Sequence, residues 1–142
     1  MSIQIYFYVH GQPQGKARPR FSKVGKFVKV YTPEKTKTYE NQIKEATILA
    51  MGPLKPLETS VAVHLHIFSS VPASYSKKRT ADCLLGYERP TKKPDIDNIA
   101  KAFLDAMNGV AYKDDSQIVY LTVTKKYAVH PCVHVSVYED IQ

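Results

Sequence analysis

One stretch of nine residues, 60–68 (SVAVHLHIF), limits most tightly how this chain of 142 residues can fold. It is rich in β-branched and aromatic residues, which favours an extended strand. Along such a strand, side chains alternate between two sides, with Val61, Val63, Leu65 and Ile67 on one and Ala62, His64, His66 and Phe68 on the other. Both sides are largely apolar or aromatic. The stretch is therefore predicted to be an inner strand of a sheet, covered on both faces.

The remaining pattern supplies the other elements of one domain over residues 1–142. Strands are predicted at residues 3–10, 117–127 and 132–138, the last two joined by a hairpin-length link at 128–131, and a short hairpin is predicted around Gly25. One helix is predicted at residues 34–50, and another from Asp95 or Asp97 to the stop at Asn108-Gly109, with an apolar stripe of Ile96, Ile99, Ala100, Phe103 and Met107. This order predicts an α+β fold, a mixed β-sheet with two main helices packed on it.

The composition favours an anionic partner. Twenty Lys and Arg face thirteen Asp and Glu, a formal net charge of +7, so nucleic acid is preferred over a membrane surface. No apolar run is long enough to cross a bilayer and the N-terminus has no signal-peptide pattern, so we expect a cytoplasmic protein with no membrane partner. No phosphate-binding or dinucleotide-binding glycine motif is present, so no nucleotide cofactor is expected.

Two basic segments are the candidates for contact with a DNA backbone. The first is the basic loop and short hairpin at residues 15–33. The second is residues 71–93, which we interpret as a surface excursion with room for a short helix at 77–85. A run such as 77–79 is more often a solvated face than a binding site. The candidates are Lys16, Arg18, Arg20, Lys77, Lys78, Arg79, Lys92 and Lys93.

The negative charge is concentrated, since five of the seven aspartates lie between residues 95 and 115. Asp95 and Asp97 stand at a helix entrance, and Asp115 stands at the turn where the next strand begins. If they converge, each close pair repels by roughly 4 kcal/mol at an effective dielectric near 20. Protonation or neighbouring lysines could offset this repulsion, but a hard divalent cation does so best: Mg²⁺, with Mn²⁺ as the alternative. Asp114 is a turn-former, a supporting group or a further ligand.

Simpler roles stand beside the catalytic ones. Asp95 or Asp97 alone is more often a helix cap than a metal ligand. Lys101, four residues after Asp97, shares its helix face and can meet a carboxylate or a phosphate, but on spacing alone it is equally a solvated lysine. Asp105 is more simply the intrahelical partner of Lys101.

The segment KPDIDNIAKAFLDAMNGVAYKDDSQI, residues 93–118, resembles the RusA family of Holliday-junction resolvases of bacteria and their prophages. The likeness rests on the P-D-x-D-N helix entrance, the lysine four residues later, the L-D-A-[LM]-N-G helix end and the D-D-[SA]-Q turn. RPRF at 18–21 and VYTPEKT at 30–36 extend it along the chain. Elsewhere the likeness is loose, and the link from Asn108-Gly109 to Asp114-Asp115 is shorter than in some members.

The resemblance implies an Mg²⁺-dependent endonuclease of DNA recombination and repair, a homodimer that makes paired symmetric nicks across a four-way DNA junction. It implies that Asp95, Asp97 and Asp115 are metal-binding catalytic carboxylates and that Lys101 is the essential basic residue. Two alternatives remain: a non-catalytic DNA-junction-binding module, and a nuclease that acts on flaps, forks or ordinary duplex.

Overall fold

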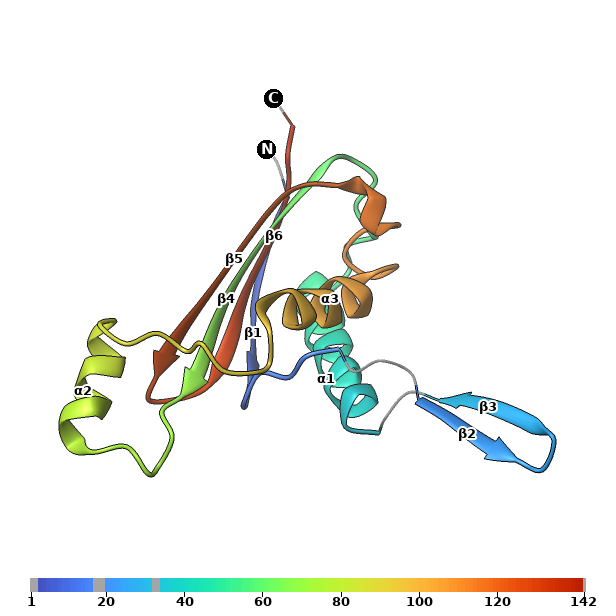
Figure 1. The fold of residues 1–142 in the computed structure, drawn as a ribbon. Helices are drawn as coiled ribbons and strands as arrows, with labels where there is room; N and C mark the ends of the chain where they lie inside the picture. Colours follow the sequence, from blue (N-terminus) through green and yellow to red (C-terminus); the bar gives the residue numbers. More distant parts are fainter. Residues whose placement is uncertain (1–2, 17–19, 32–33, 142) are drawn as a thin grey trace.

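A computed structural model describes residues 3–16, 20–31 and 34–141 of the chain (Figure 1). Its main body is one four-stranded sheet with helices against it. No helix within these ranges combines the length and the apolar character needed to span a membrane.

The main sheet is mixed, as predicted. Its strands lie in the order β1 (Gln4–His10), β6 (Cys132–Glu139), β4 (Val61–Ser70) and β5 (Ile118–Ala128). β4 runs parallel to β5 and antiparallel to β6, and β1 runs antiparallel to β6. The predicted inner position of residues 60–68 is confirmed, because β4 has a neighbour on each edge.

The hairpin predicted between the last two strands is wrong. β5 and β6 are consecutive in the chain, but they flank β4 instead of pairing with each other. Ala128 pairs with Ser70 and Cys132 pairs with Phe68, so the link at 129–131 passes the end of β4. The link must span two strand spacings, about 10 Å, to pass from β5 to β6 across β4. The four Cα-to-Cα steps from Ala128 to Cys132, at about 3.3 Å each, are long enough. A link of hairpin length can therefore also step over one strand.

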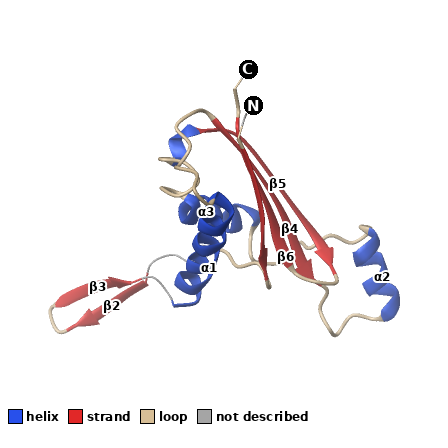
Figure 2. Ribbon diagram, turned by 180° about the vertical axis from the view of Figure 1, so that it is seen from behind, coloured by secondary structure: helices blue, strands red, loops and turns tan. Residues whose placement is uncertain are grey.

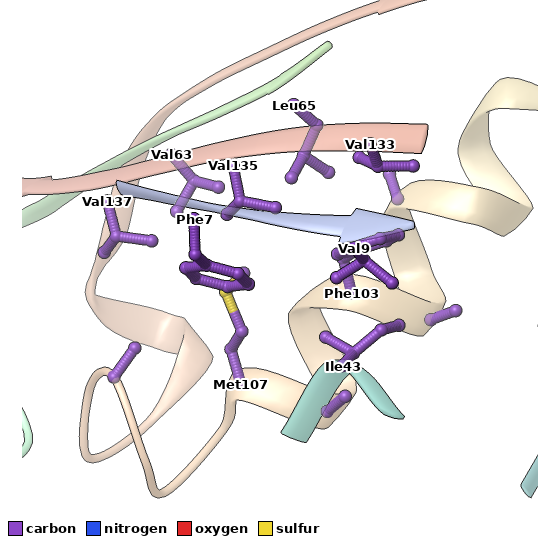
Figure 3. Close-up of a cluster of buried hydrophobic side chains, with 14 of the residues drawn as sticks. Phe7, Val9, Ile43, Val63, Leu65, Phe103, Met107, Val133, Val135 and Val137 are labelled. Atoms are coloured by element: carbon purple, nitrogen blue, oxygen red, sulfur yellow. The ribbon is translucent and has the colours of Figure 1, made fainter. Parts of the chain in front are cut away.

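One face of this sheet carries the core. α1 (Glu34–Met51) and α3 (Ile96–Met107) cover it, as the two predicted helices should. Figure 3 shows Phe7 and Val9 of β1 facing Phe103 and Met107 of α3, with Ile43 of α1 beside them. All five are buried. The α+β fold is thus confirmed.

Two burial expectations are wrong. Ile96, predicted in the apolar stripe of α3, is 41% exposed, because it lies in the first turn of the helix and faces an open cavity beside β5. His66, predicted to be covered, is exposed, and His64 and Phe68 are half-buried. The reason is that α1 and α3 both lie on the other face of the sheet (Figures 1 and 2).

Two smaller units stand apart from this body. The predicted hairpin is confirmed as β2 (Arg20–Val24) and β3 (Phe27–Tyr31), a separate two-stranded sheet. The excursion contains the short helix α2 (Lys77–Leu85), which begins at the N-cap Ser76 and ends at Gly86, where φ is 87°. Figure 1 shows α2 at the opposite end of the molecule from the hairpin.

Candidate active site

A cavity of about 530 Å³ opens between α3, the short 3₁₀ turn η1 (Asp115–Gln117) and β5. Residues spaced by four along α3 share one side of a helix, and this spacing brings Asp97, Lys101 and Asp105 to the rim. Asp115 joins them from η1, eighteen residues after Asp97 in the chain. Leu121 and Val123 of β5 and Ala100 and Leu104 of α3 supply the apolar lining.

Asp95 lies elsewhere. It lines a neighbouring cavity of about 750 Å³, together with Lys16, Lys93 and Asn98. Residues i and i+2 do not face each other on a helix, so Asp95 and Asp97 diverge at the entrance of α3. The structure therefore brings two of the three predicted carboxylates, Asp97 and Asp115, to one cavity.

Asp95 caps α3 through its backbone but not through its side chain. It occupies the N-cap position of α3 with extended backbone angles, and its carbonyl accepts the backbone N–H of Ile99 at 3.1 Å. Its carboxylate makes no capping hydrogen bond. Neither this carboxylate nor those of Asp97 and Asp115 forms an ion pair with any described residue.

Asp114 has the turn-forming role. Its carboxylate accepts hydrogen bonds from the backbone N–H and the hydroxyl of Ser116, and these bonds lower the pKa of Asp114. The backbone N–H of Asp114 donates to Oε1 of Gln117 at 2.8 Å, which closes a capping box. This arrangement holds η1, and with it Asp115, in a fixed conformation.

Gln117 contributes more than the sequence interpretation recognised. Its Nε2 donates to the carbonyl oxygens of Leu57 at 2.8 Å and Thr59 at 2.9 Å, so η1 is tied to the segment before β4. The three-residue spacing from Asp114 to Gln117 matches a capping-box pattern, and that pattern was the available signal.

The two lysines near the cavity, Lys101 and Lys16, form ion pairs with carboxylates other than those of Asp97 and Asp115. Lys101 Nζ lies 3.6 Å from Asp105 Oδ2, which confirms the intrahelical pair, and the Lys101 side chain remains 62% exposed. Lys16 Nζ pairs with Glu40 and lies 3.4 Å from Asp105. Burial lowers the pKa of Lys16, but Glu40 and Asp105 outweigh burial, so the pKa is raised.

Lys16 is held there by the chain itself. Its backbone N–H donates to the carbonyl oxygen of Asn98 at 2.9 Å. The preceding residue is Gly15, where a Cβ would lie 3.0 Å from Cβ of Asn98 and 3.2 Å from Cβ of Pro94. Glycine thus permits the close approach of this loop to α3. Lys16, a candidate for DNA contact, also links the loop to α1 and α3.

The other predicted DNA contacts divide into free and engaged groups. Lys77, Lys78 and Lys93 are exposed, and so is Lys92, although its Nζ lies 5.4 Å from the centre of the Tyr75 ring. Arg79 is engaged: its Nε lies 3.0 Å from Glu88 Oε1, and its guanidinium carbon lies 3.6 Å from the centre of the Tyr75 ring. Arg18 lies outside the described residues, and for Arg20 only the backbone, in β2, is described.

Lys125 is a second residue that the sequence interpretation missed. From β5, its Nζ donates to the carbonyl oxygens of Lys92 at 2.6 Å and Pro94 at 2.8 Å. These carbonyls belong to the segment that enters α3, so Lys125 positions the start of the helix that carries Asp95 and Asp97. No local pattern predicts a contact across 31 residues.

The donor set can be tested against the expected metal. Within residues 3–16, 20–31 and 34–141, no three His, Cys, Asp or Glu side chains lie close enough together to hold an ion. Mg²⁺, however, binds through one or two carboxylates and completes its shell with water and substrate phosphates. Asp97 and Asp115 at one cavity fit that smaller requirement.

Comparison with known proteins agrees with the motifs of residues 93–118. The family model described as Endodeoxyribonuclease RusA matches residues 10–138. The chain is also 37% identical over 142 residues to the uncharacterized protein YqaN of Bacillus subtilis (strain 168), covering 95% of this chain and 96% of that protein. The fold, the motif and these matches together show that the chain belongs to the RusA family of endodeoxyribonucleases.

Proposed function

We propose that this protein is a Mg²⁺-dependent endonuclease that resolves Holliday junctions by paired symmetric nicks. The observation that carries the proposal is the meeting of Asp97 and Asp115 at one cavity, although η1 and the start of α3 are separate segments. Both residues are exposed and neither forms an ion pair with a described residue, so their carboxylates are free to take up a cation from solution.

The residues at the cavity have distinct roles in this proposal. Asp97 and Asp115 hold the cation, and Asp114 supports the turn that carries Asp115. Asp95, which lines the second cavity, is the third candidate ligand. When bound, a divalent cation supplies electrostatic stabilisation of the charge that develops on a phosphodiester during hydrolysis. Mn²⁺ also accepts oxygen ligands and is the alternative to Mg²⁺.

Lys101 is the group best placed to meet the substrate. Its ammonium lies at the rim of the cavity and is largely exposed, so it can turn from Asp105 towards a phosphate oxygen. Removing one acidic partner from Lys101 costs little, because exposed ion pairs contribute about 0–1 kcal/mol.

The exposed lysines serve a branched DNA substrate. Lys92 and Lys93 precede α3 directly, and Lys77 and Lys78 extend the positive surface along α2. Such charges attract the phosphate backbone without reading its sequence, which suits a nuclease that recognises branched shape. A homodimer presents two equivalent sites to opposed strands of a four-way junction, and we place its action in the cytoplasm.

The decisive experiment compares a labelled four-way junction with a linear duplex, a flap and a fork, each with Mg²⁺ and with EDTA. We expect symmetric nicks in the junction with Mg²⁺, none with EDTA, and little cutting of the other substrates. Equal cutting of duplex, flap or fork would replace junction resolution with a broader nuclease activity.

Asp97→Asn tests the site itself. The substitution keeps the shape of the side chain but removes its charge, so we expect unchanged folding, unchanged junction binding and no cleavage. Asp140→Asn is the matched control, since Asp140 is exposed and does not line the cavity. An Asp97→Asn protein that cuts at the normal rate would end the assignment.

One observation favours a second candidate, a non-catalytic DNA-junction-binding module. The described residues contain no preformed three-ligand cluster, and Asp95 lies apart from the other two carboxylates. This candidate predicts tight junction binding in EDTA and no nicks at any concentration of Mg²⁺ or Mn²⁺.

A further inference from the structure

Lys101 stands midway between two aspartates on the same side of α3. Asp97 precedes it by four residues, Asp105 follows it by four, and all three line the cavity of about 530 Å³. Both carboxylates are within reach of the ammonium group, because residues four apart are neighbours on a helix surface. Which of the two holds Lys101 decides whether Asp97 is available to a ligand.

The geometry of a helix favours the pair with Asp97. Long side chains on a helix lean towards its N-terminus, over the turn that precedes them. An acidic residue four positions before a lysine also pairs better than one four positions after it. Yet Lys101 Nζ lies 3.6 Å from Asp105 Oδ2, and Asp97 forms no ion pair with any residue that the structure describes. The local preference of the helix is therefore overruled at this position.

A row of alternating charges accounts for this choice of partner. Asp105 Oδ2 also lies 3.4 Å from Lys16 Nζ, and Lys16 in turn pairs with Glu40 of α1. The exposed fraction of the side chains rises along the row, from 21% for Glu40 and 24% for Lys16 to 33% for Asp105 and 62% for Lys101. Asp105 is thus held in place from its more buried side. A carboxylate that is already ordered loses less freedom when it binds a second partner.

Asp97 does not need Lys101 to balance its charge. It lies in the first turn of α3, where unpaired backbone N–H groups and the helix dipole favour a negative side chain. Its carboxylate can therefore stay without an ion-pair partner. If Lys101 turned back to Asp97, its ammonium group would occupy the place of a cation from solution.

We propose that Asp105 is a positioning residue, which holds Lys101 away from Asp97 and so keeps the Asp97 carboxylate free for a divalent cation. Among the described residues Lys101 pairs with Asp105 alone, so the ammonium group remains open to a phosphate oxygen on its other side. The inference rests on the proposed function, because that function assigns Asp97 to the cation and Lys101 to the substrate. It adds a third residue, which acts through Lys101.

The affinity of the whole DNA-free protein for Mn²⁺, measured by isothermal titration calorimetry, tests the inference through a double-mutant cycle. Asp105→Asn keeps the shape of the side chain and lets Lys101 turn to Asp97, so it should weaken Mn²⁺ binding. In a Lys101→Met protein the same substitution removes the same charge, but no lysine is left to compete. The weakening should be about threefold larger in the natural background, the size expected for one exposed ion pair. Asp105→Glu, which restores the negative charge, should bind Mn²⁺ as the natural protein does.

A crystal structure of metal-free Asp105→Asn gives a second readout. We expect Lys101 Nζ to lie within about 4 Å of an Asp97 oxygen, the reach of an ion pair. Glu58→Gln is the matched control for the Mn²⁺ titration. It removes one acidic partner from Lys113 on an exposed surface outside the cavity, so Mn²⁺ binding should not change.

Two results would overturn the inference: equal weakening of Mn²⁺ binding in both backgrounds, or a metal-free Asp105→Asn structure in which Lys101 stays away from Asp97. Equal losses of more than about tenfold would instead make Asp105 a metal ligand. Asp97→Asn separates this inference from the proposed function. If Asp97→Asn leaves Mn²⁺ binding unchanged, or if the natural protein binds no Mn²⁺, the cation site of the proposed function fails, and the role of Asp105 fails with it. If Asp97→Asn abolishes the binding while the cycle shows no coupling, only the role of Asp105 fails.

Discussion

Charged side chains gather both around α2 and at the cavity beside α3, but Arg79 is paired in the first region, whereas two carboxylates in the second have no ion-pair partner among the described residues. In the first, Arg79 is held by Glu88 and stacks on Tyr75, so the charge is satisfied within the segment. In the second, Asp97 and Asp115 meet at one cavity and neither forms an ion pair with a described residue. A paired charge stabilises its own segment, whereas an unpaired carboxylate is available to a ligand. This difference, more than the amount of charge, separates a structural element from a candidate site.

Beyond Asp97→Asn, the largest expected effect on this comparison belongs to Asp115→Asn. Junction cleavage in Mg²⁺ should fall by more than about 100-fold, because even groups that only support a metal ligand cost about 10- to 100-fold when removed. The urea midpoint should not change, since the carboxylate has no described partner to lose. Single-turnover cleavage of a labelled junction measures the first quantity. Cleavage within a factor of two of the natural protein would remove Asp115 from the site.

Lys125→Met should come next. It removes two hydrogen bonds from a charged donor to the carbonyls of Lys92 and Pro94, so the free energy of unfolding should fall by about 2 kcal/mol. Cleavage should also fall about 10-fold, since the start of α3 loses its tether. Urea denaturation and cleavage rates measure the two effects. Lys126→Met, one residue further on the opposite face of β5, is the control and should leave cleavage unchanged.

Asp114 gives a smaller effect with a defined pH dependence. Hydrogen bonds from Ser116 lower its pKa in the folded protein, so its contribution to stability is present above the ordinary pKa of an aspartate and is lost as the pH falls through the lowered value. Asp114→Ala should lower the melting temperature at neutral pH and flatten its decline in acid. Asp114→Asn, which keeps the capping acceptor, should lose only the pH dependence. Identical melting curves for all three proteins at every pH would contradict the capping role.

Glu88→Gln should have the smallest effect on cleavage, and it tests the paired charges of the α2 region. It breaks the ion pair with Arg79 on the surface, where such pairs contribute little. Cleavage of the four-way junction should stay within a factor of two of the natural rate. A loss as large as that of Asp115→Asn would mean that the α2 region belongs to the catalytic machinery.

Much of the fold follows from local pattern. The period-two alternation at 60–68 and the apolar stripe of α3 predicted a strand and a helix at nearly their observed bounds. Strand pairing did not follow, because a three-residue link can either turn back or step over a strand. Which occurs depends on β4, distant in the chain, and the same distance hides the contact of Lys125 with Pro94.

For the candidate site, too, the local positions of the residues were predictable, but their contacts were not. The sequence placed Asp97 at a helix start and Asp115 at a turn, and both line one cavity. It could not separate Asp95 from Asp97, because the direction of each side chain depends on where α3 begins. It also could not reveal that Lys16 is engaged, since Glu40 lies on another helix.

The pairing of β1 with β6 has a consequence for the order in which the sheet can assemble. Ile3 and Glu139 exchange hydrogen bonds, so β1, the first described strand, takes its neighbour from β6, the last one. Until β6 has been synthesised, β1 has no neighbour in the main sheet and β4 can pair only with β5. A chain that ends before β6 therefore cannot form the observed four-stranded sheet.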